Sequence, residues 1–182
     1  MVLAICYLLL AVRQIIWCWL AWILSSCLYL YVMFNAGLYM EAALQIFYVA
    51  MGFYGWMQWS KGGMEDHLVV RRWGLDGHLF AVAVILILTL LSGEVLSNYT
   101  AAAMPFMDAL TTWGAIVTTY MVAKKLIENW IYWFVIDSIS IYLFISRELY
   151  FTAGLFFVYL FIIIFGYRSW KQMELVQGES SN

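Results

Sequence analysis

The stretch NWIYWFVID, residues 129–137, carries two tryptophans three positions apart and a carboxylate four positions after the second. Residues three or four positions apart lie on neighbouring turns of a helix, so Trp130, Trp133 and Asp137 are expected on one face. The segment is too apolar for the surface of a soluble helix. An aromatic pair with an acid one turn further along, inside a bilayer, would suit a flat organic cation.

The composition predicts an all-α integral membrane protein. Of the 182 residues, 66% are hydrophobic and only 11% are charged, whereas charged residues make up about 25% of a typical soluble domain. Backbone polar groups in lipid must be satisfied internally, which leaves helices or a closed barrel. Unbroken apolar runs at 80–91 and 155–165 lack the alternation of a barrel strand and therefore favour helices.

Hydropathy predicts seven transmembrane helices. A short apolar run at 1–12 is followed by spans at 15–34, 38–59, 78–96, 106–123, 127–145 and 149–167. With the N-terminus outside, eight of the nine basic residues fall in loops on one side, and only Arg147 falls on the other. Cytoplasmic loops collect Lys and Arg, so we expect an external N-terminus and a cytoplasmic C-terminus.

The chain also repeats itself after a shift of 111 residues, which aligns 16–59 with 127–170 without a gap. Identical residues meet in many pairs, among them Trp19 with Trp130, Trp22 with Trp133, Tyr48 with Tyr159, Gly55 with Gly166, and Trp59 with Trp170. The two three-helix halves are joined by a single helix, and an odd number of connecting spans keeps both halves in the same orientation in the membrane. The pattern predicts a parallel 3+1+3 repeat of the kind found in SWEET carriers.

This repeat divides the chain into four parts. Residues 1–59 are expected to form the first three-helix repeat, and residues 106–170 the second. Residues 60–105 would hold a cytoplasmic loop and the connector helix, and residues 171–182 a cytoplasmic tail. The same shift maps 105–123 onto a first helix that would begin before Met1, so that helix is expected to be short.

Several polar and aromatic residues are candidates for a substrate site. Asp137 is the main one, since an acid inside a span is costly and indicates function by default. Gln45, Tyr48, Gly52 and Trp56 form a stripe along one helix face, for which helix–helix hydrogen bonding is the alternative. Tyr159 lies on a similar stripe with Thr152 and Gly166. The residues themselves predict substrate contacts at Gln45, Tyr48, Trp130, Trp133 and Asp137.

Other residues are candidates for gates or for cavity walls: Trp19, Trp22, Asp108 and Tyr159. Asp108 could instead be a partner for a helix N-terminus. Trp59 and Trp170 lie beside charged helix ends, and we expect them to be interfacial anchors.

No hydrolytic or nucleotide-binding motif is present, so we do not expect an enzyme. Cys6, Cys18 and Cys27 lie in or beside apolar segments without the spacing of metal ligands. We therefore expect no metal and no cofactor. The expected partners are a small-molecule substrate and the lipid bilayer, without nucleic acid, and a homo-oligomer stays open.

Five segments resemble the PnuC family of bacterial vitamin transporters. They contain Ile16 to Trp19, Leu44 to Trp56, Asp108 to Thr112, the ENWIYW stretch at 128–133 and Gly166 to Trp170. The resemblance covers nearly the whole chain and is weakest over 60–97. The sequence departs from the family pattern at Leu20, where proline is frequent, and at Trp22, where a small residue is common.

The resemblance implies facilitated uptake of nicotinamide riboside across the bacterial inner membrane, with trapping by a cytoplasmic kinase. Carried onto matching positions, it implies substrate contacts at Gln45, Asn129, Trp130 and Trp133. Thiamine or another vitamin is the alternative substrate. A membrane receptor or scaffold that transports nothing is the alternative of another class, and a bulky Trp22 would narrow the cavity.

Overall fold

The computed structural model describes residues 2–35, 39–60, 69–100 and 104–179. Within these ranges the chain forms seven α-helices, and the all-α expectation is confirmed. They are α1 (Val2–Val12), α2 (Trp17–Asn35), α3 (Tyr39–Ser60), α4 (Leu75–Tyr99), α5 (Pro105–Ala123), α6 (Asn129–Ser146) and α7 (Tyr150–Glu179). Each lies within a few residues of an apolar run predicted from hydropathy, except that α7 continues well beyond residue 167.

Three of these helices are long and apolar enough to cross a bilayer. They cover Leu75–Tyr99, Asn129–Ser146 and Tyr150–Gln177, while Val2–Val12 and Trp17–Val32 are shorter apolar helices. Many large apolar side chains on the outside of the bundle are exposed, including Phe80 and Phe151 at 72% and 93%. Exposed apolar surface of this extent is typical of a bundle that is solvated by lipid.

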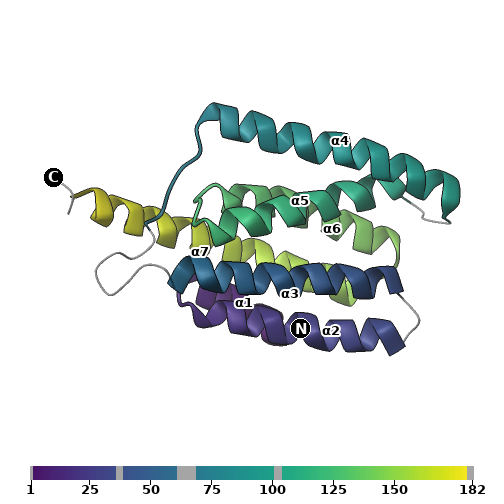
Figure 1. Ribbon diagram of the computed structural model, residues 1–182, viewed down its shortest axis with the longest axis horizontal. Helices are drawn as coiled ribbons and strands as arrows, with labels where there is room; N and C mark the ends of the chain where they lie inside the picture. Colours follow the sequence, from purple (N-terminus) through teal and green to yellow (C-terminus); the bar gives the residue numbers. More distant parts are fainter. Residues whose placement is uncertain (1, 36–38, 61–68, 101–103, 180–182) are drawn as a thin grey trace.

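The helices form two groups of three, with α4 on the outside (Figure 1). In the first group α2 packs against α1 and α3, and in the second α6 packs against α5 and α7. The groups meet where α1 packs against α7 and α3 packs against α5. Helix α4 packs along α5. The two groups therefore meet along two helix pairs, α1 with α7 and α3 with α5.

The bundle has two ends, which we name after a residue at each. The Lys125 end holds the α1–α2 turn, the α5–α6 turn and the end of α7, and the Asp108 end holds the start of α5 and the end of α6 (Figure 1). At the Lys125 end the two turns have the same geometry. Gln14 and Lys125 both have positive φ, 54° and 52°. Their N–H groups donate to Ala11 O and Val122 O, each at 3.0 Å.

The final turns of α7 are held by a segment that crosses the Lys125 end. Arg72 forms an ion pair with Glu174 at 2.6 Å, and the Val70 N–H donates to Gln177 Oε1 at 3.1 Å. Arg71 pairs with the α5–α6 turn, since its N–H donates to Lys125 O and its carbonyl accepts from the Ile127 N–H, both at 3.0 Å. Residues 171–177, expected as a tail, therefore continue the helix.

Replacing Arg72 by alanine is expected to change the free energy of unfolding by less than about 1 kcal/mol, because exposed ion pairs are screened by solvent. The Arg72 side chain is 49% exposed. Denaturation in mild detergent would measure this effect, with Glu174→Ala as the matched control from the other side of the pair. A loss of several kcal/mol in either variant would show that the pair stabilises far more than its exposure predicts.

Candidate functional site

A cavity of about 180 Å³ lies between the two groups of helices. Helix α6 contributes Trp133 and Asp137, one turn apart, and α2 contributes Trp22. The remaining walls come from α1 and α7: Ala4, Tyr7, Leu8, Phe156, Tyr159 and Ile163. Asp137 is 4% exposed, so its carboxyl group is set into the wall and shielded from the outside of the bundle.

The chemistry of this cavity combines flat aromatic walls with one acid. Indole and phenol rings offer stacking surfaces, and the face of an indole attracts a cation. A carboxylate in a weakly polar environment strengthens that preference. Among the lining residues there is no Lys or Arg. The cavity therefore suits a planar ring, and a positively charged ring better than a negatively charged group.

The Trp22 side chain forms part of the cavity wall. Its ring centre lies 4.8 Å from that of Tyr7 and 5.5 Å from that of Tyr48. The Trp22 Nε1–H donates to Tyr48 O at 2.8 Å, which fixes the indole against α3. Tyr48 and Gln45 lie on α3, and neither is among the residues that line the cavity. Of the predicted substrate contacts, the cavity therefore brings together Trp133 and Asp137 but not Gln45 and Tyr48.

Asn129 and Trp130, at the start of α6, lie nearer the Lys125 end than the cavity does. Asn129 is fully buried, and its Nδ2 donates to Leu126 O at 2.5 Å, while its Oδ1 has no hydrogen-bond partner. Trp130 is 2% exposed, and its Nε1 also has no partner. These buried polar atoms are hydrogen-bonding groups that a ligand or a rearrangement could satisfy.

Four tryptophans form a buried cluster at the Lys125 end. The rings of Trp19 and Trp59 lie 5.5 Å apart at 88°, and those of Trp130 and Trp170 lie 5.5 Å apart at 90°. The two pairs meet through Trp59 and Trp170, whose ring centres lie 6.2 Å apart. The expectation that Trp59 and Trp170 are interfacial anchors is wrong, because they are only 7% and 0% exposed. Each pairs with an indole from its own three-helix group.

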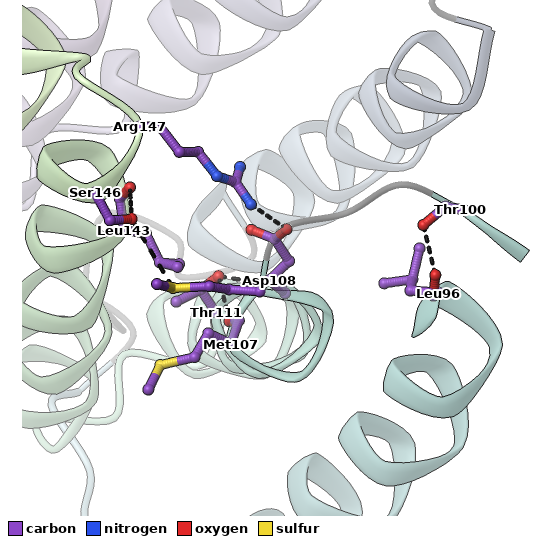
Figure 2. Close-up of polar contacts among 9 residues, drawn as sticks. Leu96, Thr100, Met107, Asp108, Thr111, Leu143, Ser146 and Arg147 are labelled. Carbon is purple, nitrogen blue, oxygen red and sulfur yellow. Dashed lines mark hydrogen bonds and ion pairs between the residues drawn. The ribbon is translucent and has the colours of Figure 1, made fainter. Parts of the chain in front are cut away.

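Asp108 lies in the first turn of α5, at the opposite end of the bundle from this cluster. Its Oδ2 forms an ion pair with Arg147, the residue that follows α6 (Figure 2). Thr111 supports the same turn by donating its hydroxyl to Asp108 O at 3.1 Å. The pair links the two helices at the Asp108 end and does not enter the cavity, and both of its side chains are about one third exposed.

Sequence reasoning missed several cavity residues whose signal lay in the repeat. Shifting the stripe Gln45, Tyr48 and Gly52 by 111 residues gives Phe156, Tyr159 and Ile163, and all three line the cavity. Of these only Tyr159 was predicted. Tyr7 was also missed, although it is the one aromatic residue of α1.

A larger cavity, of about 400 Å³, lies between α4, α5 and α6. Its lining is mostly aliphatic, with Ile85, Leu110 and Ile136 among its residues, and Thr111 and Tyr132 bring the only hydroxyl groups. It has no charged residue and few groups that could orient a polar molecule. The smaller cavity is therefore the better candidate for a site that binds a polar molecule.

Comparison with known proteins agrees with this description. The family model described as "Nicotinamide mononucleotide transporter" matches residues 1–172. The nicotinamide riboside transporter PnuC of Escherichia coli (strain K12) is 25% identical over 173 residues, which cover 81% of this chain and 72% of the relative. The riboflavin/roseoflavin transporter RibM of Streptomyces davaonensis is 27% identical over 175 residues, covering 93% and 81%.

A solved structure is also similar. The crystal structure of the vitamin B3 transporter PnuC matches with a TM-score of 0.70 and 22% identity, covering 92% of this chain and 77% of that one. At this identity the similarity shows a shared fold. The match of the family model over nearly the whole sequence identifies the chain as a multi-pass membrane protein of the nicotinamide mononucleotide transporter family, and the relatives named here are transporters and not enzymes.

Proposed function

We propose that this protein carries nicotinamide riboside across the bacterial inner membrane by facilitated diffusion, and that a cytoplasmic kinase traps the imported riboside by phosphorylating it. The observation that carries the proposal is the cavity in which Trp133, Tyr159 and Asp137 meet between the two groups of helices. Nicotinamide riboside has a flat pyridinium ring, which an indole attracts through its face. Phosphorylation adds negative charge, and the cavity offers no basic residue for it.

The substrate also has an amide and ribose hydroxyls, which need hydrogen-bond partners. Gln45 and Asn129 are the proposed partners, since an amide side chain both donates and accepts. Asn129 Oδ1 is buried without a partner. Gln45 does not line the cavity, so its contact with the substrate requires a wall residue such as Trp22, which bonds to α3, to move. On this proposal Trp22 moves as substrate enters.

The architecture proposed for this activity is a pair of parallel three-helix repeats, residues 1–59 and 106–170, joined through α4. It is supported by contacts that recur after 111 residues, such as Trp19 on Trp59 and Trp130 on Trp170. Transport would proceed as one repeat rocks against the other. Seven spans with an external N-terminus place the Lys125 end in the cytoplasm, in keeping with its basic residues.

Uptake into proteoliposomes tests this function. The purified protein is reconstituted without ATP or an ion gradient and given labelled nicotinamide riboside, its mononucleotide, thiamine or riboflavin in turn. We expect the riboside to equilibrate without accumulating, and to accumulate only when a riboside kinase and ATP are enclosed. Accumulation without a kinase would contradict facilitated diffusion. Uptake of the mononucleotide at the rate of the riboside would contradict the proposed exclusion of phosphate.

Replacing Asp137 by asparagine is expected to weaken binding of a cationic ring about tenfold, since a charge-assisted contact is lost. Binding of a neutral ring should change by less than twofold, because the asparagine keeps the size of the side chain. Calorimetric titration with nicotinamide riboside and with riboflavin would measure both. Equal losses of affinity for the two ligands would show that Asp137 supports the fold and does not recognise the charge of the ligand.

Riboflavin is a second candidate because the RibM relative carries that vitamin in its name. Its ring system is larger than a pyridinium, and the Trp22 ring, which lines the cavity, packs against Tyr48. Replacing Trp22 by alanine is expected to raise the affinity for riboflavin relative to nicotinamide riboside by about tenfold, by adding room for the third ring. Competition binding measures the ratio, and an unchanged ratio would mean that Trp22 does not set substrate size.

A further inference from the structure

Lys125 is a buried basic residue at the end of the bundle. Its residue surface is 6% exposed, its Nζ donates to Gln14 Oε1 at 2.9 Å, and its ammonium lies 4.8 Å from the centre of the Trp59 ring. Neither partner carries a charge, and the two ion pairs found among the described residues lie elsewhere. Burial lowers the pKa of Lys125 to about 8. A buried cation without a carboxylate is costly, so its retention points to a role beyond stability.

The contact between Lys125 and Gln14 joins the two halves of the protein. Gln14 lies in the α1–α2 turn and Lys125 in the α5–α6 turn, 111 residues apart. The two residues are therefore each other's counterparts in the repeat. Both have left-handed backbone geometry, which is uncommon for residues other than glycine. Strained positions of this kind persist where the surroundings hold them in place.

Two further hydrogen bonds join the halves beside this contact, and they are reciprocal. Trp59 Nε1–H donates to Val122 O at 3.2 Å, and Trp170 Nε1–H donates to Ala11 O at 3.0 Å. Each tryptophan reaches from the last helix of one half to the first helix of the other. All four residues are buried. The Lys125 end is thus closed by one central contact and a symmetric pair on either side of it.

The turn that carries Lys125 is itself held from outside. The Arg71 N–H donates to Lys125 O at 3.0 Å, and Arg71 O accepts from the Ile127 N–H at 3.0 Å. These bonds fix the backbone on both sides of the side chain that makes the contact with Gln14. The turn is therefore held in place, and separation of the halves must break the side-chain contacts.

We propose that Lys125 and Gln14 form the central contact of a gate that closes this end of the transporter, with Trp59 and Trp170 as its flanking contacts. This inference rests on the proposed function, because it requires the halves to rock apart. Opening breaks the Lys125–Gln14 hydrogen bond and hydrates the ammonium. The gate is separate from the cavity, whose lining includes neither residue.

Cys18 provides a native probe of this gate. It is fully buried in the same core as Trp59, Val122 and Ala123, whereas Cys6 and Cys27 are exposed and can be replaced by serine. In lipid nanodiscs, we expect a water-soluble maleimide to modify Cys18 at least tenfold faster in Lys125→Met than in the parent. Gln14→Leu should have the same effect, since it removes the acceptor. Lys171→Met is the matched control, because it removes an exposed lysine at the same end of the bundle. It should leave the rate of Cys18 modification unchanged.

Exchanging the two residues is the decisive variant. In the double change Gln14→Lys and Lys125→Gln, the donor and acceptor are swapped across the repeat, and Trp170 replaces Trp59 as the neighbouring ring. We expect Cys18 modification to return to within twofold of the parent. All rates are measured well below the melting temperature of each variant, which separates gate opening from unfolding.

Two results would overturn the gate. One is a rate of Cys18 modification equal to that of the parent in a Lys125→Met or Gln14→Leu variant that is shown to be folded. The other is a folded exchange variant that is modified as fast as the single variants. Failure of the proposed function looks different: no vitamin would bind, while the Cys18 rates would still rise in the single variants and recover on exchange.

Discussion

Replacing Trp133 by alanine is expected to weaken binding of nicotinamide riboside about 5- to 150-fold, since stacking and cation–π attraction together contribute about 1–3 kcal/mol. Trp133 lines the cavity one turn from Asp137, and on the proposed function its ring stacks on the pyridinium. The measurement is calorimetric titration of the purified variant, with its melting temperature recorded in parallel.

Trp17→Ala is the matched control for this substitution. Trp17 begins α2, is 57% exposed, and contacts only one other aromatic ring, that of Trp56 at 5.4 Å, among the described residues. Its loss removes the same side chain away from the cavity, and affinity should stay within twofold of the parent. If the two variants lost affinity equally, the effect would come from the membrane fold and not from Trp133.

Replacing Gly166 by alanine is expected to destabilise the protein by about 1–3 kcal/mol, the usual effect of overpacking a core. A Cβ atom at this position would lie 2.5 Å from the Trp130 ring. That ring cannot easily move, because the edge of Trp170 holds it at 5.5 Å and 90°. The melting temperature should fall by about 2–12 °C, as expected for a chain of this size.

Two variants frame this result. Gly55→Ala, the counterpart in the first half, meets the Trp19 ring in the same way and should cause a similar loss. Gly154→Ala, on the same helix as Gly166, has no atom within 4 Å of the added Cβ and should be neutral or slightly stabilising. A Gly166 variant as stable as the Gly154 variant would mean that the tryptophan cluster is loosely packed.

The positions of the helices could be predicted from the sequence, because apolar runs of membrane length have few other structures open to them. The end of α7 could not. Residues 171–177 mix polar and apolar side chains, and their helix is held by Arg72 and Val70, which lie about 100 residues away in the chain. Contacts over such separations leave no local pattern.

The candidate site was predicted in part. Trp133, Asp137, Tyr159 and Trp22 do lie together around one cavity. Spacing on one helix could not reveal which neighbouring helix each side chain meets. Trp130, predicted beside Trp133, packs instead on Trp170. The prediction for Trp59 and Trp170 was wrong for the same reason. A tryptophan near a charged helix end can face lipid or another helix, and its sequence position does not distinguish the two.

The central claim is that this cavity binds a flat vitamin, and calorimetric titration of the purified protein with nicotinamide riboside tests it most directly. We predict saturable binding of one riboside per chain, lost or strongly weakened in a folded Trp133→Ala variant. Binding of thiamine or riboflavin in place of the riboside would keep the site and change the vitamin. Absence of binding by all three to a folded, monodisperse protein would contradict the account.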